Sequence, residues 1–154
     1  KATQPTTDDL LLLDRQLCFP LYACSKEVVR RYAPLLEPLG LTYTQYIALM
    51  VIWEQGPITV HDLGERLLLD SGTLTPLLRK LEERGIVARE RCRQDARKVY
   101  VRATDKGMAL RERARSVPRA MGQCFDLTRE EADELRRILR KVTRNVRAHE
   151  ADTA

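Results

Sequence analysis

The chain has 154 residues, of which 44% are hydrophobic and 32% are charged. This length suits one folded domain that buries roughly 70% of its unfolded surface, so folding needs no disulfides. Four scattered cysteines and only two histidines argue against a zinc site and against a Cys-x-x-Cys redox motif. No apolar run reaches the ~18 residues of a membrane span, and the first residues show no signal-peptide pattern. We therefore expect a cytoplasmic protein with reduced thiols, no cofactor, no metal and no membrane association.

The net charge of +5 is concentrated in one segment. Nine Lys or Arg residues lie between Arg79 and Arg102, against four acidic residues, so the rest of the chain is neutral on balance. A localised basic patch indicates a polyanionic partner. A solvated charged surface is the alternative interpretation of any such charge run.

Capping residues and apolar spacing predict two helices in the first third of the chain. Asp8 or Asp9 can cap a first helix that runs with interruptions to about Leu36. Thr42 can cap a second helix that continues through Trp53 and stops at Gly56-Pro57.

A possible reactive thiol lies in the first of these helices. Cys18 and Tyr22 are four residues apart, so they would share a helix face and the phenol could donate a hydrogen bond to the thiolate. Pro20 is tolerated best in a first helical turn, which predicts that Cys18 lies near a helix start, where the helix dipole also favours a thiolate. A free cysteine is more often a small buried hydrophobe, so Cys18 by itself does not establish a sensor.

Two short helices follow in close succession, capped by Thr59 and by Asp70-Ser71. The second carries leucines at helical spacing: Leu74, Leu77, Leu78 and Leu81. After Gly85 the helical spacing of apolar residues ends. Residues 86–91 and 98–102 are typical of short strands, and the polar residues 93–97 join them. These segments predict two adjacent helices and a β-hairpin with a basic tip.

The C-terminal part of the chain is predicted to be helical. Thr104 opens a helix to about Val117-Pro118, and Thr128 and Glu131 have capping-box spacing before the last helix. The terminal helices lie outside the compact middle and would bury their apolar stripes by pairing between two subunits. The predicted fold is mainly α with a small β-hairpin wing. A winged helix-turn-helix at residues 42–103 is flanked by dimerisation helices at 8–40 and 105–149, in one compact domain overall.

Helix, tight connection, helix and basic hairpin form the pattern of a winged helix-turn-helix, which inserts its second helix into the major groove of DNA. That helix begins with small hydroxyl residues suited to phosphates and base edges. Arg97 at the hairpin tip is placed to enter a minor groove, and Asp95 could hold its guanidinium. Simple N-capping and an ordinary turn are the alternatives for these features taken singly. The predicted DNA-binding residues are Ser71, Gly72, Thr73, Thr75, Pro76, Arg79, Lys80, Arg91, Arg93, Asp95, Arg97 and Lys98.

Three segments and the hairpin together resemble a known family. The segments are QLCFPLY at 16–22, LTYTQY at 41–46 and LDSGTLTPLL at 69–78, and the hairpin carries Asp95-Ala96-Arg97. They resemble the MarR (multiple antibiotic resistance) regulators and, within them, the organic hydroperoxide resistance regulators (OhrR), over roughly residues 10–146. The resemblance implies a homodimeric repressor that binds a pseudo-palindromic operator in double-stranded DNA and responds to organic hydroperoxides.

The resemblance also implies roles for individual residues. Cys18 would be the redox sensor, and Tyr22, Tyr32 and Tyr43 from the same and the partner subunit would hydrogen-bond to its thiolate. Cys124, expected in the loop before the last helix, lies close to the position of the resolving cysteine in two-cysteine members. Such a residue would form a disulfide with oxidised Cys18 of the other subunit, and the DNA-binding regions would then shift.

The other two cysteines have no such match. Cys24 is expected to be buried and inert, and Cys92 in the hairpin is expected to be incidental. Two alternative functions stay open: a MarR-type regulator that binds a small aromatic ligand, with Cys18 serving only in packing, and a thiol peroxidase. A peroxidase would need a reductant-accessible thiol pair and leaves the basic wing unexplained, so we expect a regulator and not an enzyme.

Overall fold

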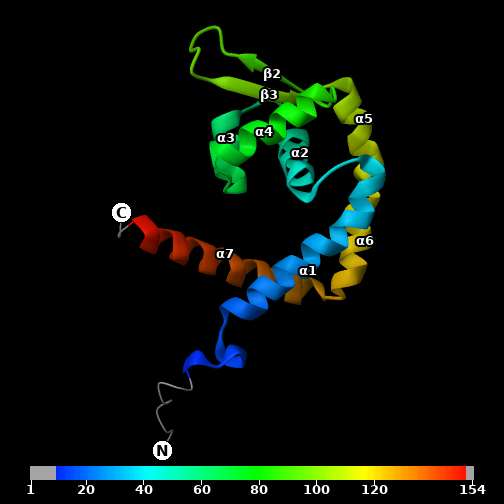
Figure 1. Cartoon of the computed structure of the whole chain (residues 1–154). Coiled ribbons are helices and arrows are strands. Elements are labelled where there is room, and N and C mark those ends of the chain that lie inside the picture. Colours follow the sequence, from blue (N-terminus) through cyan, green and yellow to red (C-terminus); the bar gives the residue numbers. More distant parts are fainter. Residues whose placement is uncertain (1–9, 152–154) are drawn as a thin grey trace, which may run out of the picture. The chain divides into compact units, whose positions relative to one another are not determined.

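The structure is a computed structural model that describes residues 10–151, and Figure 1 labels its main elements. The first part contains η2 (Leu13–Arg15), α1 (Cys18–Leu36), η3 (Glu37–Leu39) and α2 (Tyr43–Gln55). The middle contains β1 (Ile58–Thr59), α3 (Val60–Leu67), α4 (Ser71–Glu83), β2 (Val87–Arg91) and β3 (Val99–Ala103). The last part contains α5 (Asp105–Ala114), α6 (Ser116–Phe125) and α7 (Arg129–Ala151). The predicted fold class, helical with a small β wing, is confirmed.

The chain divides into two compact units, with the boundary after Val117. This division differs from the single compact domain that the sequence predicted. Four large apolar side chains of α7 remain 38% to 57% exposed, and a helix whose apolar stripe is largely unburied contributes little to a shared core. They are Leu135, Ile138, Leu139 and Val146.

Helix α1 begins at Cys18, much later than the sequence predicted. Its N-cap residue, Leu17, makes no side-chain capping hydrogen bond, and Pro20 is the third helical residue. The predicted capping residues Asp8 and Asp9 lie outside the described residues. The prediction that Cys18 lies near a helix start is confirmed.

The predicted caps of α2, α3 and α4 are confirmed. Thr42 and Gln45 form a reciprocal capping box at the start of α2, with N···O distances of 3.3 and 3.1 Å. The side chains of Thr59 and Asp70 each accept a hydrogen bond from the N–H three residues on, at 3.0 and 2.8 Å. Each cap satisfies N–H groups that have no partner inside the helix, which is why these helices begin where they do.

The core of the first unit lies between α2, α3, α4 and a three-stranded antiparallel sheet of order β1-β3-β2. Strands β2 and β3 pair from Val87 opposite Ala103 to Arg91 opposite Val99. The hairpin that they form projects beyond α3 and α4 (Figure 1). Strand β1, which the sequence analysis missed, adds two residues beside β3 and is too short to show a strand period.

The prediction of a loop at Cys124 is wrong. Helix α5 ends at Ala114, and α6 follows at once and continues to Phe125, so Cys124 lies in its last turn. Pro118 is the third residue of α6, where its missing N–H would have no partner inside the helix in any case. The proline therefore belongs to the start of a helix instead of marking a helix end.

The predicted capping box at the start of α7 is confirmed. The backbone N–H of Thr128 donates to a Glu131 carboxylate oxygen at 2.9 Å, and the N–H of Glu131 donates to the Thr128 hydroxyl at 3.2 Å. This reciprocal pair fixes where the last helix begins.

Among residues 10–151, no single helix is long and apolar enough to cross a membrane. The segments Cys18–Leu39 and Tyr43–Gln55 have that length and composition only as a pair bent by 70°.

Candidate nucleic-acid interface and thiol sites

Helix α4 turns its polar residues outward. Its leucines are all buried in the core, so the positions between them remain exposed. The first N–H groups of a helix have no intrahelical partner, and together with small hydroxyl side chains they suit phosphate oxygens. The structure places all seven predicted α4 residues on this exposed side: Ser71, Gly72, Thr73, Thr75, Pro76, Arg79 and Lys80.

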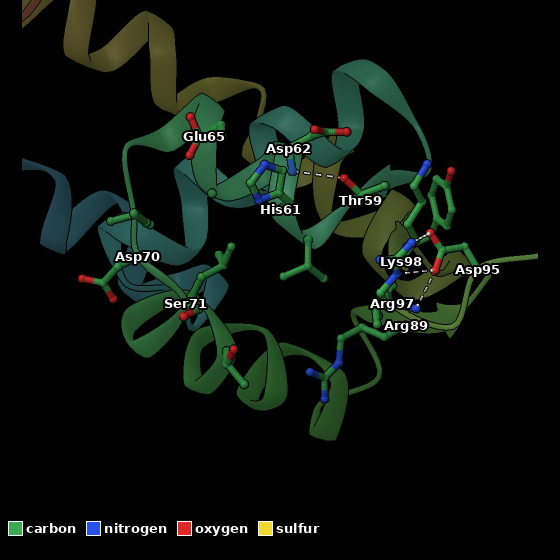
Figure 2. A pocket seen from close by; sticks show the side chains of 17 residues that line it. Thr59, His61, Asp62, Glu65, Asp70, Ser71, Arg89, Asp95, Arg97 and Lys98 are labelled. Atoms are coloured by element: carbon green, nitrogen blue, oxygen red, sulfur yellow. Dashed lines mark hydrogen bonds and ion pairs between the residues drawn. The ribbon is translucent and has the colours of Figure 1, made fainter. Parts of the chain in front are cut away.

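A groove of about 890 Å³ lies between the start of α4, helix α3 and the wing (Figure 2). Ser71 and Thr75 line it from α4, and Arg97 and Lys98 line it from the wing. Hydroxyl and cationic groups from elements far apart in the sequence thus face one opening. His61 lines the groove from α3 and was missed by the sequence analysis. The predicted cap at Thr59 already placed His61 in the first turn of this helix, and that was the available signal.

The tip of the wing is held by one carboxylate. Asp95 accepts hydrogen bonds from the Nε, the Nη2 and the backbone N–H of Arg97, at 3.1, 3.3 and 3.1 Å. The Arg97 side chain and then its backbone N–H hold the pKa of Asp95 below its usual range. The Arg97 side chain is 91% exposed, so an outward-projecting guanidinium has an ordered base. The expected contact between these two residues is confirmed.

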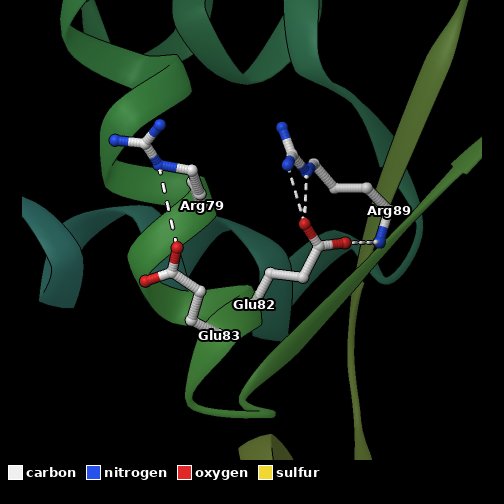
Figure 3. A network of polar contacts seen from close by, with 4 residues as sticks. All are labelled: Arg79, Glu82, Glu83 and Arg89. Atoms are coloured by element: carbon white, nitrogen blue, oxygen red, sulfur yellow. Dashed lines mark hydrogen bonds and ion pairs between the residues drawn. The ribbon is translucent and has the colours of Figure 1, made fainter.

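Not every cation of the basic segment is available to a polyanion. Arg84 donates to the backbone carbonyls of Leu39 and Gly40. Arg89 is paired with Glu82 at 2.7 Å (Figure 3). The number of Lys and Arg residues in the segment therefore overstates the number of cations available to a polyanion. The other predicted wing cations, Arg91, Arg93 and Lys98, are exposed.

The structure leaves three of the four cysteines on the surface of the chain. Cys18 begins α1 and is exposed, as are Cys124 and Cys24. The prediction that Cys24 is buried is wrong for the single chain, in which its side chain is exposed. Helix α1 buries only Leu36. Cys92 in the wing is half-buried, and its backbone N–H donates to the Lys98 carbonyl at 2.8 Å.

Three tyrosines form a cluster where α1 meets α2. The ring of Tyr32 lies 4.9 Å from that of Tyr43 and 5.8 Å from that of Tyr46, measured between centroids. Burial, followed by the neighbouring Tyr32 and Tyr43, raises the pKa of Tyr46 to about 12. Burial and then Tyr43 also raise the pKa of Tyr32. Tyr32 and Tyr46 are therefore protonated hydrogen-bond donors at neutral pH. The sequence analysis did not single out Tyr46, although it lies one turn after Tyr43.

The tyrosine cluster and Cys18 lie at opposite ends of α1. Fourteen residues separate Cys18 from Tyr32, which corresponds to about 21 Å along a helix. No hydrogen bond can bridge that distance. Of the predicted partners of the thiol, the structure brings only Tyr22, 63% exposed and one turn further along α1, near Cys18 in the same chain.

An exposed polar helix face beside a basic hairpin defines a winged helix-turn-helix of the DNA-binding class. The MarR family model matches residues 41–99. The organic hydroperoxide resistance transcriptional regulator of Bacillus subtilis (strain 168) is 42% identical over 130 residues, which cover 84% of this chain and 86% of that protein. The chain therefore belongs to the MarR family, and its fold is that of a DNA-binding transcriptional regulator.

Solved structures agree with this assignment. The structure of reduced AbfR bound to DNA has a TM-score of 0.77 and 32% sequence identity, and the match covers 93% of this chain and 98% of that chain. The structure of overoxidized AbfR bound to DNA has a TM-score of 0.75 and 33% identity, covering 92% and 99%. The chain is thus similar to one protein, AbfR, whose structure on DNA is known in a reduced and in an overoxidized state.

Proposed function

We propose that this protein is a homodimeric repressor that leaves its operator when an organic hydroperoxide oxidises Cys18. The observation that carries the proposal is an exposed thiol at the first residue of α1, in a chain whose middle is a winged DNA-binding region. The similarity to an organic hydroperoxide resistance regulator supports the same assignment.

The chemistry at Cys18 follows from its place in the helix. Its exposure at the first residue of α1 makes the sulfur accessible to a peroxide, and the thiolate form of a cysteine is the nucleophile in this reaction. It attacks the outer peroxide oxygen, so the O–O bond breaks, an alcohol leaves and Cys18 becomes a sulfenic acid. A second thiol then displaces water from the sulfenic acid to form a disulfide, and we assign this resolving role to Cys124 of the partner subunit.

A second subunit supplies the tyrosines that one chain cannot bring to Cys18. Since about 21 Å of helix separates Cys18 from Tyr32 within a chain, Tyr32 and Tyr43 would reach the thiol only from a partner whose α1 runs the opposite way. A buried phenol with a raised pKa keeps its proton at neutral pH and can donate it in a hydrogen bond to a thiolate.

Two DNA-binding regions in one dimer make release possible. A dimer must match two half-sites about 34 Å apart, so a small rotation of one region relative to the other breaks the register. In each region the α4 residues would enter the major groove, with Arg97 in the adjacent minor groove and Arg91, Arg93 and Lys98 on phosphates.

The test is a DNA-binding titration with and without cumene hydroperoxide, run beside non-reducing gels. The probe is a duplex that the reduced wild-type protein selects from a random-sequence pool. We expect the peroxide to release the wild type and to crosslink its subunits. Cys18→Ser should stay bound, and Cys124→Ser should be oxidised without a crosslink. A wild type that keeps its affinity, with no crosslinked dimer, would overturn the proposal.

A second candidate function is a response to a small aromatic ligand without cysteine chemistry. A cavity of about 540 Å³ lies at the corner between α1 and α2. Val29 and Ala33 line it from α1, Leu41 lines it from the connecting segment, and Tyr43 lines it from the start of α2. Apolar cavities of this size accommodate small ligands. The same titration separates the two functions, since release of Cys18→Ser by peroxide would exclude Cys18 as the sensor.

A further inference from the structure

One ion pair joins the recognition helix α4 to the wing. Glu82, in the last turn of α4, accepts hydrogen bonds from the Nε and Nη2 of Arg89 at 3.0 and 2.7 Å. Its other carboxylate oxygen accepts the backbone N–H of Arg89, in strand β2, at 3.2 Å. Figure 3 shows both oxygens engaged, one by the guanidinium and one by the backbone of the strand.

The neighbouring pair on the same helix is different. Arg79 and Glu83 are 3.9 Å apart, and their side chains are 65% and 66% exposed. The Arg89 and Glu82 side chains are only 27% and 37% exposed. Exposed pairs contribute little to stability, whereas a partly buried pair held by three N–H···O bonds fixes the relative position of its two residues. Only the Glu82 pair is therefore suited to hold one element against another.

We propose that Glu82 is a positioning residue for DNA binding. By holding Arg89, it fixes strand β2 and hence the wing against α4, so that the helix and Arg97 meet neighbouring grooves of the same duplex. Arg89 lines the groove between α4 and the wing, so the pair lies at the junction of the two reading elements. This proposal rests on the proposed DNA-binding face and not on the peroxide chemistry.

The sign of the expected effect separates positioning from simple electrostatics. Glu82→Gln removes one negative charge from a surface that binds a polyanion, and charge alone would then strengthen binding to any duplex. If Glu82 positions the wing, the same substitution weakens binding to the selected sequence. Glu83→Gln makes the same change of charge one residue further along the helix and is the matched control.

The experiment uses the full reduced protein with two duplexes, one selected by the wild type and one of scrambled sequence. For Glu82→Gln we expect roughly tenfold weaker binding to the selected duplex, with binding to the scrambled duplex unchanged or stronger. Glu83→Gln should lose affinity for neither. If Glu82→Gln binds the selected duplex as tightly as Glu83→Gln does, the positioning role is overturned.

Two further variants keep the proposal testable if the Glu82→Gln protein does not fold, and they also test the DNA-binding face itself. Arg89→Lys keeps the charge but loses the planar fork, and it should weaken binding to the selected duplex alone. If it binds like the wild type, Glu82 does not act through Arg89. Arg97→Ala tests the DNA-binding face itself. If Arg97→Ala binds DNA more weakly while Arg89→Lys binds like the wild type, the positioning role is overturned and the DNA-binding face stands. If neither variant loses affinity, the proposed DNA-binding face is overturned as well.

Discussion

At the scale of single residues, Gly107 shows a position decided by close packing. Its carbonyl accepts a hydrogen bond from the Trp53 indole at 3.1 Å, and its N–H donates to the Thr104 hydroxyl at 3.1 Å. A Cβ at this position would overlap the Ile86 carbonyl oxygen, which belongs to the backbone and cannot rotate away. Only glycine fits where α5 meets Ile86, the residue before strand β2.

We therefore expect Gly107→Ala to lower the free energy of unfolding by about 3 kcal/mol, as overpacking against a fixed atom does. Gly122→Ala is the control, because among the described residues no atom beyond its chain neighbours and the backbone of its own helix lies within 4 Å of its Cβ position. In helix α6 that change should raise stability by up to about 1 kcal/mol. Urea unfolding of the reduced protein measures both, and equal effects of the two substitutions would contradict the expectation.

At the scale of elements, three cations join the end of α4 to the α1–α2 corner and to α5. Arg84, at the C-cap of α4, donates to the carbonyls of Leu39, at 3.3 Å, and Gly40. Lys106 donates to the Arg84 carbonyl at 2.7 Å, and Arg113 donates to the Pro38 carbonyl at 2.8 Å. Carbonyls at helix ends lack intrahelical partners and carry partial negative charge, so cations are favourable there. The corner thereby connects α1, which begins at Cys18, with α4.

Removing the Arg84 side chain should loosen this corner. We expect Arg84→Ala to destabilise the protein by about 1 to 2 kcal/mol, because two backbone carbonyls lose a charged donor. Arg79→Ala, on the exposed side of the same helix, should change stability by less than about 0.5 kcal/mol. Thermal unfolding at fixed protein concentration measures the difference, and an Arg84→Ala protein as stable as Arg79→Ala would show that these bonds contribute nothing.

At the scale of the whole molecule, α7 carries an apolar stripe that its own chain leaves exposed. Leu135, Ile138 and Leu139 are each about two-fifths exposed. The proposed dimer would bury this stripe, and that burial would drive association. Two DNA-binding regions would then be held at one fixed separation.

Leu139→Asp should therefore shift the protein toward monomers and weaken operator binding by more than about tenfold, because a monomer engages one half-site. Arg144→Gln lies outside the stripe and makes the same change of net charge, so it should leave association intact. Sedimentation velocity gives the oligomeric state, and a titration with the selected duplex gives the affinity. A Leu139→Asp protein that remains a dimer would show that α7 is not part of the interface.

The sequence alone was enough to predict the starts of α2, α3, α4 and α7, the wing and the outward face of α4. Thr42, Thr59 and Asp70 act through the N–H groups within three residues of them, so their signals are local. The leucines of α4 recur at helical spacing, which determines the exposed face without knowledge of the rest of the fold. Asp95 and Arg97 are only two residues apart, so their contact could also be predicted from the sequence.

What only the tertiary structure decided depends on contacts between distant residues. The sequence could not show that Arg84 and Arg89 are already engaged within the chain, since their partners at Leu39, Gly40 and Glu82 are chosen by packing. It misplaced Cys124 because a proline can either end a helix or begin one, and the short break between α5 and α6 carries no strong signal. The local chain thus determined which elements form, while tertiary packing determined which of their charges and thiols face outward.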